Sequence, residues 1–406
     1  MRLYPLHVIN WFLRRRVKTM SEHRPFWFFC APAKKPERTR RMPGWGFSVE
    51  PWVAALGREL ADVFAVEGWQ VLDGTVRFRG ELLVEPELAM HLVSQRVEPL
   101  GFVPVLHTPR EITLMRLPAG AHDVPRSWRG WPLNLALFLA TLCTTLFVGA
   151  IMEGADPLSQ PLTLVSGVPF SASLLVILGC HELGHYLTAR AYGVQVSLPY
   201  FVPLPVPPLG TMGAIIRMRS PIPNRKVLFD IGIAGPLSGL VVGLPILALG
   251  LALSPVKPLT GVVLQEGNSL AYLALKWVIK GPIPAGSDVM LHPMALAGWL
   301  GLFVTALNLM PLSQLDGGHI AYAVLGRGFR KAVWPFLGIL VTLFLVSRWE
   351  GWLVWVILAV ALGLRHPPPL DDLTPLDAPR RRLALVALVL LVVLLTPLPF
   401  AVYELG

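Results

Sequence analysis

The chain has 406 residues, of which 54% are hydrophobic and only 15% are charged, and its mean hydropathy is +0.58. Soluble globular proteins carry about 25% charged residues, so this composition excludes an ordinary soluble protein, and the abundance of apolar residues excludes a disordered chain. Three cysteines are too few, and odd in number, for a secreted scaffold held by disulfides. The composition therefore predicts a membrane protein with several spans.

The net charge of +10 is concentrated at the N-terminus. Residues 1–41 contain eleven Lys or Arg and two Glu, so this segment carries nine of the ten net charges. The nearly neutral remainder argues against nucleic-acid binding, and the tail is expected to contact anionic lipid headgroups. We interpret residues 1–46 as a basic tail without a cleavable export signal. A later translation start at Met20 or Met42 is the alternative.

Residues 47–125 have the composition of a small soluble α/β domain. Apolar residues at helical spacing alternate here with short stretches of period two, which predicts an α-β-β-α-β-β order. Neither a glycine-rich phosphate loop nor a cluster of His or Cys is present, so the sequence does not predict what this domain does. The expected elements are a helix from Trp52 to Val66, a strand at 75–79 continued by 81–84, a helix at 87–100 and strands at 102–106 and 112–117.

Residues 126–406 are predicted to form an α-helical membrane domain, because a span needs about 20 mostly apolar residues. About seven spans are expected, of which the fifth and sixth are short. Residues 262–281 form an apolar segment interrupted by charge, which suggests a re-entrant or interfacial piece. The candidate spans are 131–152, 163–192, 228–254, 291–313, 332–347, 351–364 and 384–403.

The distribution of Lys and Arg predicts the orientation, because short loops rich in these residues stay in the cytoplasm. The loop with Glu153 and Asp156 contains no positive charge and is expected outside. Lysines in the long loop after the third span and Arg348 are exceptions. We therefore expect a protein of the cell membrane whose α/β domain is cytoplasmic. Basic residues expected inside are Arg126, Arg129, Arg217, Arg219, Arg225, Lys226, Arg327, Arg330, Lys331, Arg365 and Arg380–Arg382.

A His-Glu-x-x-His pattern, His181 to His185, lies near the end of the second expected span. Residues four apart on a helix share one face, with Cβ atoms about 5–6 Å apart, so both imidazoles can bind one zinc ion. Glu182 stands beside them and can take a proton from zinc-bound water. The alternative is a pair of hydrogen-bonded helix histidines, but ionisable residues within a membrane are costly and usually functional.

Asp316 is the expected third zinc ligand, since a catalytic site needs three protein ligands and an open position for water. It lies beyond the fourth expected span, before Gly317 and Gly318, which free the backbone. The charge pattern places Asp316 and the two histidines toward the same, cytoplasmic, side of the membrane. The alternative for Asp316 is a turn residue. His319 is considered as a fourth ligand but is expected to face the cytoplasm.

With these motifs the sequence resembles the site-2 protease family of intramembrane zinc metalloproteases, strongly over about 163–320. The absence of a PDZ domain and the α/β domain ahead of the spans are similar to the branch found in cyanobacteria and chloroplasts. The glycines of the second block are interpreted as sites of close helix packing. Three blocks carry the resemblance: His181–His185; Gly210–Gly213 with Gly232–Gly239; and Asn308-x-x-Pro311-x-x-x-Leu-Asp316-Gly-Gly.

The resemblance implies roles for individual residues. His181, His185 and Asp316 would bind one Zn²⁺ per chain, Glu182 would be the catalytic base and Asn308 would help to bind the substrate. The implied activity is hydrolysis of peptide bonds within or near transmembrane segments, as in regulated intramembrane proteolysis. The expected partners are a membrane-protein substrate with a single span and the lipid bilayer, with no nucleic acid and no identified regulatory partner.

Residues 199–219 are predicted to form a small membrane-associated β-hairpin. The proline-rich stretch 199–208 cannot be a helix, and residues 214–219 partly alternate apolar and basic side chains, as an edge strand would. A substrate helix must unwind before its peptide bond can be cut, and its addition as a strand at this edge would hold it extended. The alternative is a surface loop tied to the membrane.

Three other functions stay open at this point. A transporter or metal-handling protein could line an ion path with the same His and Asp residues, although it would not need Glu182 beside them. A metalloprotease with a downstream Glu ligand is disfavoured, because Glu266, Glu350 and Glu404 are expected on the outer side. A family member without activity is argued against by the complete motif.

Overall fold

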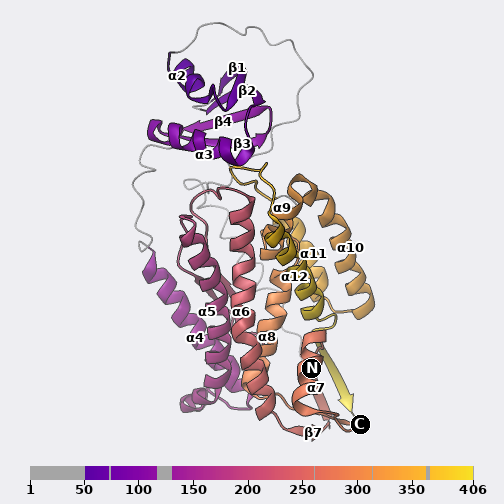
Figure 1. The fold of residues 1–406 in the computed structure, drawn as a ribbon. Helices are drawn as coiled ribbons and strands as arrows, with labels where there is room; N and C mark the ends of the chain where they lie inside the picture. The colour runs from indigo at the N-terminus through magenta and orange to yellow at the C-terminus, as the bar shows by residue number, and fades with distance from the viewer. Residues whose placement is uncertain are drawn as a thin grey trace. The chain divides into compact units, whose positions relative to one another are not determined.

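The computed structural model describes residues 51–72, 75–116, 130–259, 261–312, 314–362 and 366–405. All of them except Pro51 belong to one compact unit, Trp52–Gly406. The predicted basic tail, and Arg126, Arg129 and Arg365 of the charge pattern, lie outside the described residues. Figure 1 shows the ribbon of the whole chain.

The first part of the unit is an α/β domain with the order α-β-β-α-β-β. Its first strand, Phe64–Leu72, was not among the expected elements, and the expected strand at 75–79 and its continuation form one strand, Thr75–Leu82. Its four strands form an antiparallel sheet in the order β1-β2-β4-β3. Its core contains buried apolar residues of both helices and of the sheet, among them Leu60, Phe64, Phe78, Val93 and Leu114. The elements are α2 (Pro51–Leu60), β1 (Phe64–Leu72), β2 (Thr75–Leu82), α3 (Pro86–Val97), β3 (Phe102–Thr108) and β4 (Glu111–Arg116).

The prediction of a helix from Trp52 to Val66 is wrong at its C-terminal end. Helix α2 ends at Leu60, and Phe64 already begins strand β1. Val63 and Phe64 are buried in the structure, as they would be in a longer helix. The spacing of the apolar residues therefore did not distinguish a continued helix from the start of a strand. The antiparallel pairing of β1 with β2 decides the outcome, because β-branched and aromatic residues such as these fit well in a half-buried sheet.

The rest of the chain is mainly helical (Figure 1). Three short strand pairs accompany the helices among the described residues, including the hairpin β5 (Tyr200–Pro203) and β6 (Thr211–Ile215). The helices are α4 (Trp131–Met152), α5 (Val168–Ala191), α6 (Arg225–Leu253), α7 (Leu270–Lys280), α8 (Pro293–Asn308), α9 (Asp316–Leu325), α10 (Phe329–Ser347), α11 (Gly351–Leu362) and α12 (Ala378–Leu394). The remaining strands are β7 (Val256–Pro258), β8 (Gly261–Glu266), β9 (Ser287–Val289) and β10 (Phe400–Leu405).

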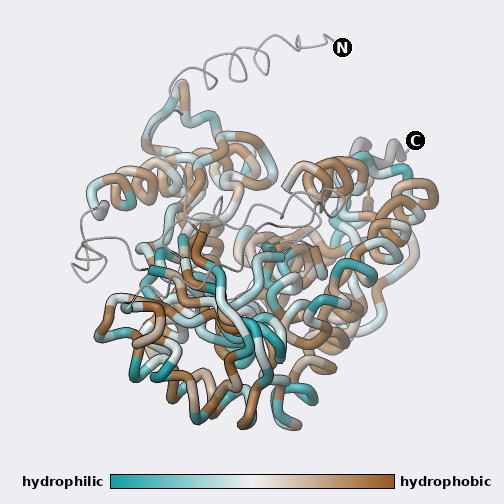
Figure 2. The backbone as a smooth tube through the Cα atoms, turned by 90° about the horizontal axis from the view of Figure 1, so that it is seen from above, coloured by the Kyte–Doolittle hydropathy of each residue, from teal (hydrophilic) through white to brown (hydrophobic). Residues whose placement is uncertain are grey.

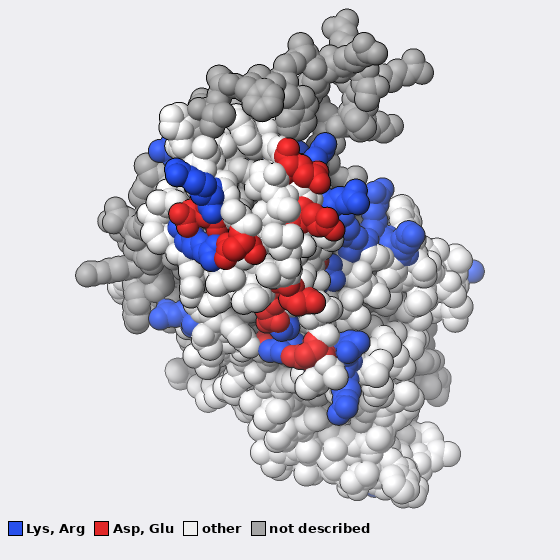
Figure 3. All heavy atoms as spheres, turned by 45° about the horizontal axis from the view of Figure 1, so that its top comes forward, with Lys and Arg blue, Asp and Glu red and all other residues white. Residues whose placement is uncertain are grey.

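Among the described residues, four helical segments are long and apolar enough to cross a membrane: Trp131–Met152, Pro161–Ala191, Arg225–Leu253 and Asp316–Ser347. Two shorter apolar helices, Pro293–Asn308 and Gly351–Ala361, accompany them. Many large apolar side chains of these helices are exposed, such as Val241 and Val346, as expected where lipid covers the surface. Figure 2 shows the long hydrophobic stretches, and the helical surface in view in Figure 3 is almost free of charge. The chain is a multi-pass membrane protein.

The segment 262–281, which was expected to be re-entrant or interfacial, consists of strand β8 followed by helix α7. Helix α7 has 11 residues and begins after Ser269, whose side chain accepts a hydrogen bond from the backbone N–H of Tyr272. A helix of this length is far too short to cross a bilayer. Strand β8 pairs with β10 near the C-terminus, so the segment lies at one end of the helices, opposite the end that holds α9 (Figure 1).

Helices α5, α6 and α8 pack against one another and, with α9, surround the candidate site. The hairpin follows α5, with Tyr200 opposite Ile215 and Phe201 opposite Ala214. The predicted edge strand at 214–219 therefore begins earlier than expected, at Thr211, and ends at Ile215. Beyond it, Met218 makes an isolated bridge with Val196.

Candidate metal centre

Helix α5 presents the two histidines of the His-Glu-x-x-His pattern on one face. His181 and His185 are each 5% exposed, and their Nε2 atoms are 3.2 Å apart. The two rings are inclined at 72° with centroids 4.9 Å apart. This is the arrangement expected for residues four apart on a helix, and it directs both ring nitrogens at the same point.

Asp316 reaches this point from α9, 135 residues beyond His181. Its Oδ2 atom is 3.1 Å from Nε2 of His181, and its Oδ1 atom is 3.2 Å from Nε2 of His185. Pro311 follows the end of α8 and cannot continue that helix, so the chain turns and α9 begins at Asp316. A carboxylate in the first turn of a helix is also favoured by the helix dipole.

The three side chains fit a zinc ion by their donor chemistry and by their spacing. They are the one described group of His, Cys, Asp or Glu whose ligand atoms converge, all within 4.8 Å of one another. Two ligand atoms bound tetrahedrally to zinc at about 2.0–2.1 Å lie about 3.3 Å apart. The two Nε2 atoms here are 3.2 Å apart, and each lies 3.1–3.2 Å from a different carboxylate oxygen of Asp316.

Helix α6 orients the histidines from behind. The backbone carbonyl of Ile231 accepts a hydrogen bond of 2.7 Å from Nδ1 of His185. Metal-binding histidines usually donate their second ring N–H to such an acceptor, which fixes the tautomer and the ring orientation. The position of Ile231 follows from the start of α6, where the Asn224 side chain caps the helix by accepting from the N–H of Val227.

The glycines of α6 make space for the same two imidazole rings. A Cβ atom on Gly235 would lie 2.0 Å from Nε2 of His185, and one on Gly239 would lie 3.2 Å from Nδ1 of His181. The interpretation of this glycine run as helix packing is therefore incomplete, because at Gly235 and Gly239 the space is occupied by the candidate ligands. The spacing of the glycines, four residues apart like the histidines, was the available signal in the sequence.

Glu182 is buried beside the two histidines, with 6% of its surface exposed. Its carboxylate lies near the backbone of Ile216 and interacts electrostatically with His185 and Asp316. Ile216 directly follows β6, so the hairpin strand leads to this carboxylate. This contact joins segments more than thirty residues apart, and no sequence pattern indicated it.

Asn308 and His319 lie differently with respect to the three converging groups. Nδ2 of Asn308, the last residue of α8, is 3.3 Å from Nε2 of His181, so the structure places this predicted residue at the site. His319 is not part of the described metal group. Its Nδ1 atom instead lies 2.6 Å from Nε2 of His366.

Comparison with known proteins agrees with this arrangement. Residues 169–345 match Peptidase family M50, a match that contains all three converging side chains. The chain is therefore similar to this family over a little less than half of its length. Family M50 is the site-2 protease family, so the resemblance found in the sequence is confirmed.

The chain is also similar to plant proteins that are named as probable zinc metalloproteases. It is 33% identical over 245 residues to "Probable zinc metalloprotease EGY1, chloroplastic" of Oryza sativa subsp. japonica. The aligned region covers 57% of this chain and 41% of that protein. It is 30% identical over 244 residues to "Probable zinc metalloprotease EGY2, chloroplastic" of Arabidopsis thaliana. The aligned region covers 59% of this chain and 43% of that protein. The chain thus spans less than half of the length of these relatives.

Proposed function

We propose that this protein is a zinc-dependent intramembrane protease that hydrolyses peptide bonds within or near transmembrane segments of other membrane proteins. The convergence of His181, His185 and Asp316, from helices α5 and α9, carries the proposal. The match to family M50 and the names of the plant relatives support it.

Each residue of the site has a role in this proposal. His181, His185 and Asp316 hold one zinc ion, which when bound polarises the scissile carbonyl and lowers the pKa of a water molecule toward about 7. Glu182 takes the proton of the attacking water and passes it to the leaving amine. Asn308, whose amide lies beside His181, donates a hydrogen bond to the substrate.

The hairpin presents the substrate in this scheme. Strand β6 pairs with β5 on one side, so its other edge can accept an extended peptide by strand addition. Because Ile216 follows β6 and its backbone lies near Glu182, a peptide aligned along this strand would pass close to the base. We propose as the substrate a membrane protein with a single span, whose helix unwinds at the hairpin.

We further propose that about seven spans place the site toward the cytoplasm of the cell. Helix α5 ends at Ala191 and the segment with Arg217, Arg219 and Arg225 follows at the same end of the helices. Lys and Arg favour the cytoplasmic side, so water would reach the site from there. The α/β domain would then be cytoplasmic.

The zinc content of detergent-purified protein tests the proposal without a known substrate. We expect about one zinc per chain by elemental analysis of the wild type, and a strong loss in Asp316→Ala. Asp156→Ala is the matched control, since Asp156 lies exposed in the loop after α4 and takes no part in the metal group.

A transporter or metal-handling protein is the competing function, and the same measurement separates the two. Wild-type protein without zinc, or an unchanged zinc content in Asp316→Ala, would contradict the protease site and return Asp316 to the role of a turn residue. Zinc bound as expected but without any peptide hydrolysis in the wild type would favour a family member that has lost activity.

A further inference from the structure

Helix α9, which carries Asp316, has only ten residues and is not a continuation of α8. It ends at Leu325, before Gly326, whose φ of 53° is left-handed. The position of Asp316 therefore depends on what packs against this short helix. The segment 366–372, which follows α11, contacts one face of α9 at His319 and Tyr322.

His366 makes the first of these contacts and is 7% exposed. Its Nε2 atom lies 2.6 Å from Nδ1 of His319, and its ring stacks on that of Tyr322 with centroids 4.5 Å apart and an interplanar angle of 21°. His319 and Tyr322 are three residues apart, so they share one face of α9. His366 therefore contacts α9 at two residues that lie within two helical turns of Asp316.

Hydrogen bonding assigns the protons of the two rings. Nδ1 of His366 is 2.7 Å from the carbonyl oxygen of Pro367, which can only accept. His366 therefore donates from Nδ1 and, when neutral, accepts at Nε2 from Nδ1 of His319. Burial lowers the pKa of His366 well below its usual value, which agrees with a neutral ring in this position.

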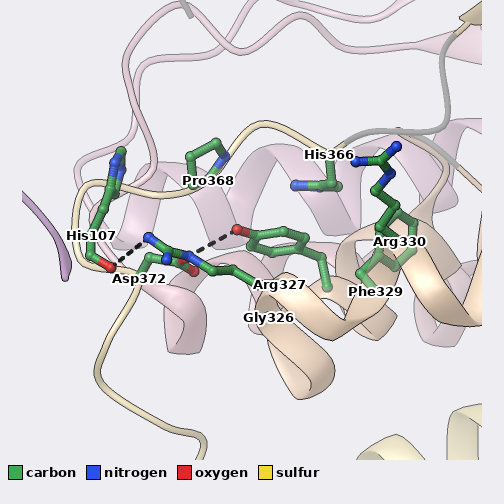
Figure 4. Close-up of a pocket in the computed structure, with 9 residues that line it drawn as sticks. His107, Gly326, Arg327, Phe329, Arg330, His366, Pro368 and Asp372 are labelled. Carbon is green, nitrogen blue, oxygen red and sulfur yellow. Dashed lines mark hydrogen bonds and ion pairs between the residues drawn. The ribbon is translucent and has the colours of Figure 1, made fainter. Parts of the chain in front are cut away.

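Asp372 makes the second set of contacts and is 2% exposed. Its Oδ2 atom accepts a hydrogen bond of 3.2 Å from the hydroxyl of Tyr322, and its Oδ1 atom accepts one of 2.9 Å from Nε of Arg225. Arg225 is the first residue of α6. Asp372 therefore joins α9 to the helix that supplies Ile231 and Gly235 to the metal centre. His366, Pro368 and Asp372 line the pocket drawn in Figure 4.

Backbone hydrogen bonds fix this segment on both sides. The N–H of Leu370 donates to Ile222 O at 2.9 Å, and the N–H of Asp371 donates to Pro223 O at 2.8 Å, just before α6. On the other side, the N–H of Leu106 in β3 donates to Leu370 O at 2.7 Å. These hydrogen bonds attach the segment to the start of α6 and to the α/β domain, so it provides a fixed surface for α9.

We propose that His366 and Asp372 are positioning residues that hold α9, and with it Asp316, in register with the histidines of α5. This inference rests on the proposed function, because it assumes that Asp316 is a zinc ligand. It also gives the α/β domain a supporting role that the sequence did not predict, because strand β3 is hydrogen-bonded to the segment that carries both residues.

The test compares Co²⁺ binding, followed by the visible absorption of the protein-bound ion, in wild type and three variants. His366→Phe keeps a ring to stack on Tyr322 but cannot accept from His319. We expect it to bind Co²⁺ about 10–100-fold more weakly, as is usual when a group supporting a metal ligand is lost, with an altered spectrum. His366→Gln retains an acceptor and should recover most of the affinity. Tyr322→Phe, which loses the bond to Asp372, should weaken binding several-fold.

Lys276→Met, at the opposite end of the helices, is the control for general loosening. It should unfold more easily and yet keep the wild-type Co²⁺ affinity and spectrum. Unchanged Co²⁺ binding in His366→Phe and Tyr322→Phe would overturn the positioning proposal and leave the metal site standing, as would an equal loss in Lys276→Met. Wild-type protein that binds neither Co²⁺ nor Zn²⁺ would overturn the proposed function as well.

Discussion

A methyl group on Gly235 would lie 2.0 Å from Nε2 of His185, the atom that points at Asp316. This separation is far below any tolerable contact, and the added carbon would occupy the side of the imidazole at which a metal ion binds. Gly235→Ala is therefore expected to displace the His185 ring and to remove most of the bound zinc. Elemental analysis of the purified variant checks this.

Gly243→Ala is the matched control on the same helix. A Cβ atom there would meet Ile177 and Leu302 at 3.7 Å, an ordinary van der Waals distance. We expect this variant to keep its zinc. Equal zinc contents in Gly235→Ala and the wild type would show that His185 does not bind the metal in the orientation seen here.

The residues of the metal centre could be predicted because their chemistry is encoded over short distances. His181, Glu182 and His185 fall within five residues on one helix, and Asp316 stands at a helix break marked by proline and glycine. Apolar stretches of sufficient length likewise predicted the helices α4, α5 and α6 within a few residues. Both signals depend on local sequence alone.

The supporting contacts could not be predicted, because they join segments that only the tertiary structure brings together. No sequence pattern gives His366 a role, and its contact with His319 spans 47 residues. Lys276 was an exception to the charge pattern, whereas in the structure its ammonium group is buried against Asp288. Spacing carries no information about which distant residue fills such a position.

Glu182→Gln is expected to retain about one zinc per chain and to lose proteolysis. The amide has nearly the same shape as the carboxylate but cannot take the proton of the attacking water, and loss of a general base typically costs about 10²–10⁴-fold in rate. Cleavage of unfolded casein by detergent-solubilised protein measures this, with zinc analysis of the same sample. Substantial cleavage by the variant would rule out Glu182 as the base.

Ile216→Pro tests the interaction between the backbone after the hairpin and Glu182. Proline removes the N–H of Ile216, which lies near the Glu182 carboxylate, and the preceding residue, Ile215, is in a strand, as a residue before proline prefers. We expect the variant to keep its zinc but to cleave casein at least tenfold more slowly.

Ile216→Ala is the control for this change, because it shortens the side chain and retains the N–H. It should lose much less activity than the proline variant. Similar losses in both would indicate that the side chain of Ile216, rather than its backbone, matters for catalysis.

Lys276→Met should destabilise the protein at the end opposite α9. Nζ of Lys276 lies 2.6 Å from Oδ1 of Asp288 and 3.5 Å from Oε1 of Glu266, and all three side chains are about 10% exposed. Removal of the one cation leaves two buried carboxylates uncompensated, which typically costs about 3–5 kcal/mol. Unfolding in mixed detergent micelles measures the change in free energy.

Lys257→Met makes the same chemical change at an exposed site on β7, where Lys257 has no ion pair with another described residue. Exposed substitutions of this kind usually stay within about 0.5 kcal/mol of the wild type. The buried network predicts a difference of several kcal/mol between the two variants. Equal stabilities would mean that water reaches Asp288 and Glu266 freely, and that Lys276 does not hold β8 and β9 against α7.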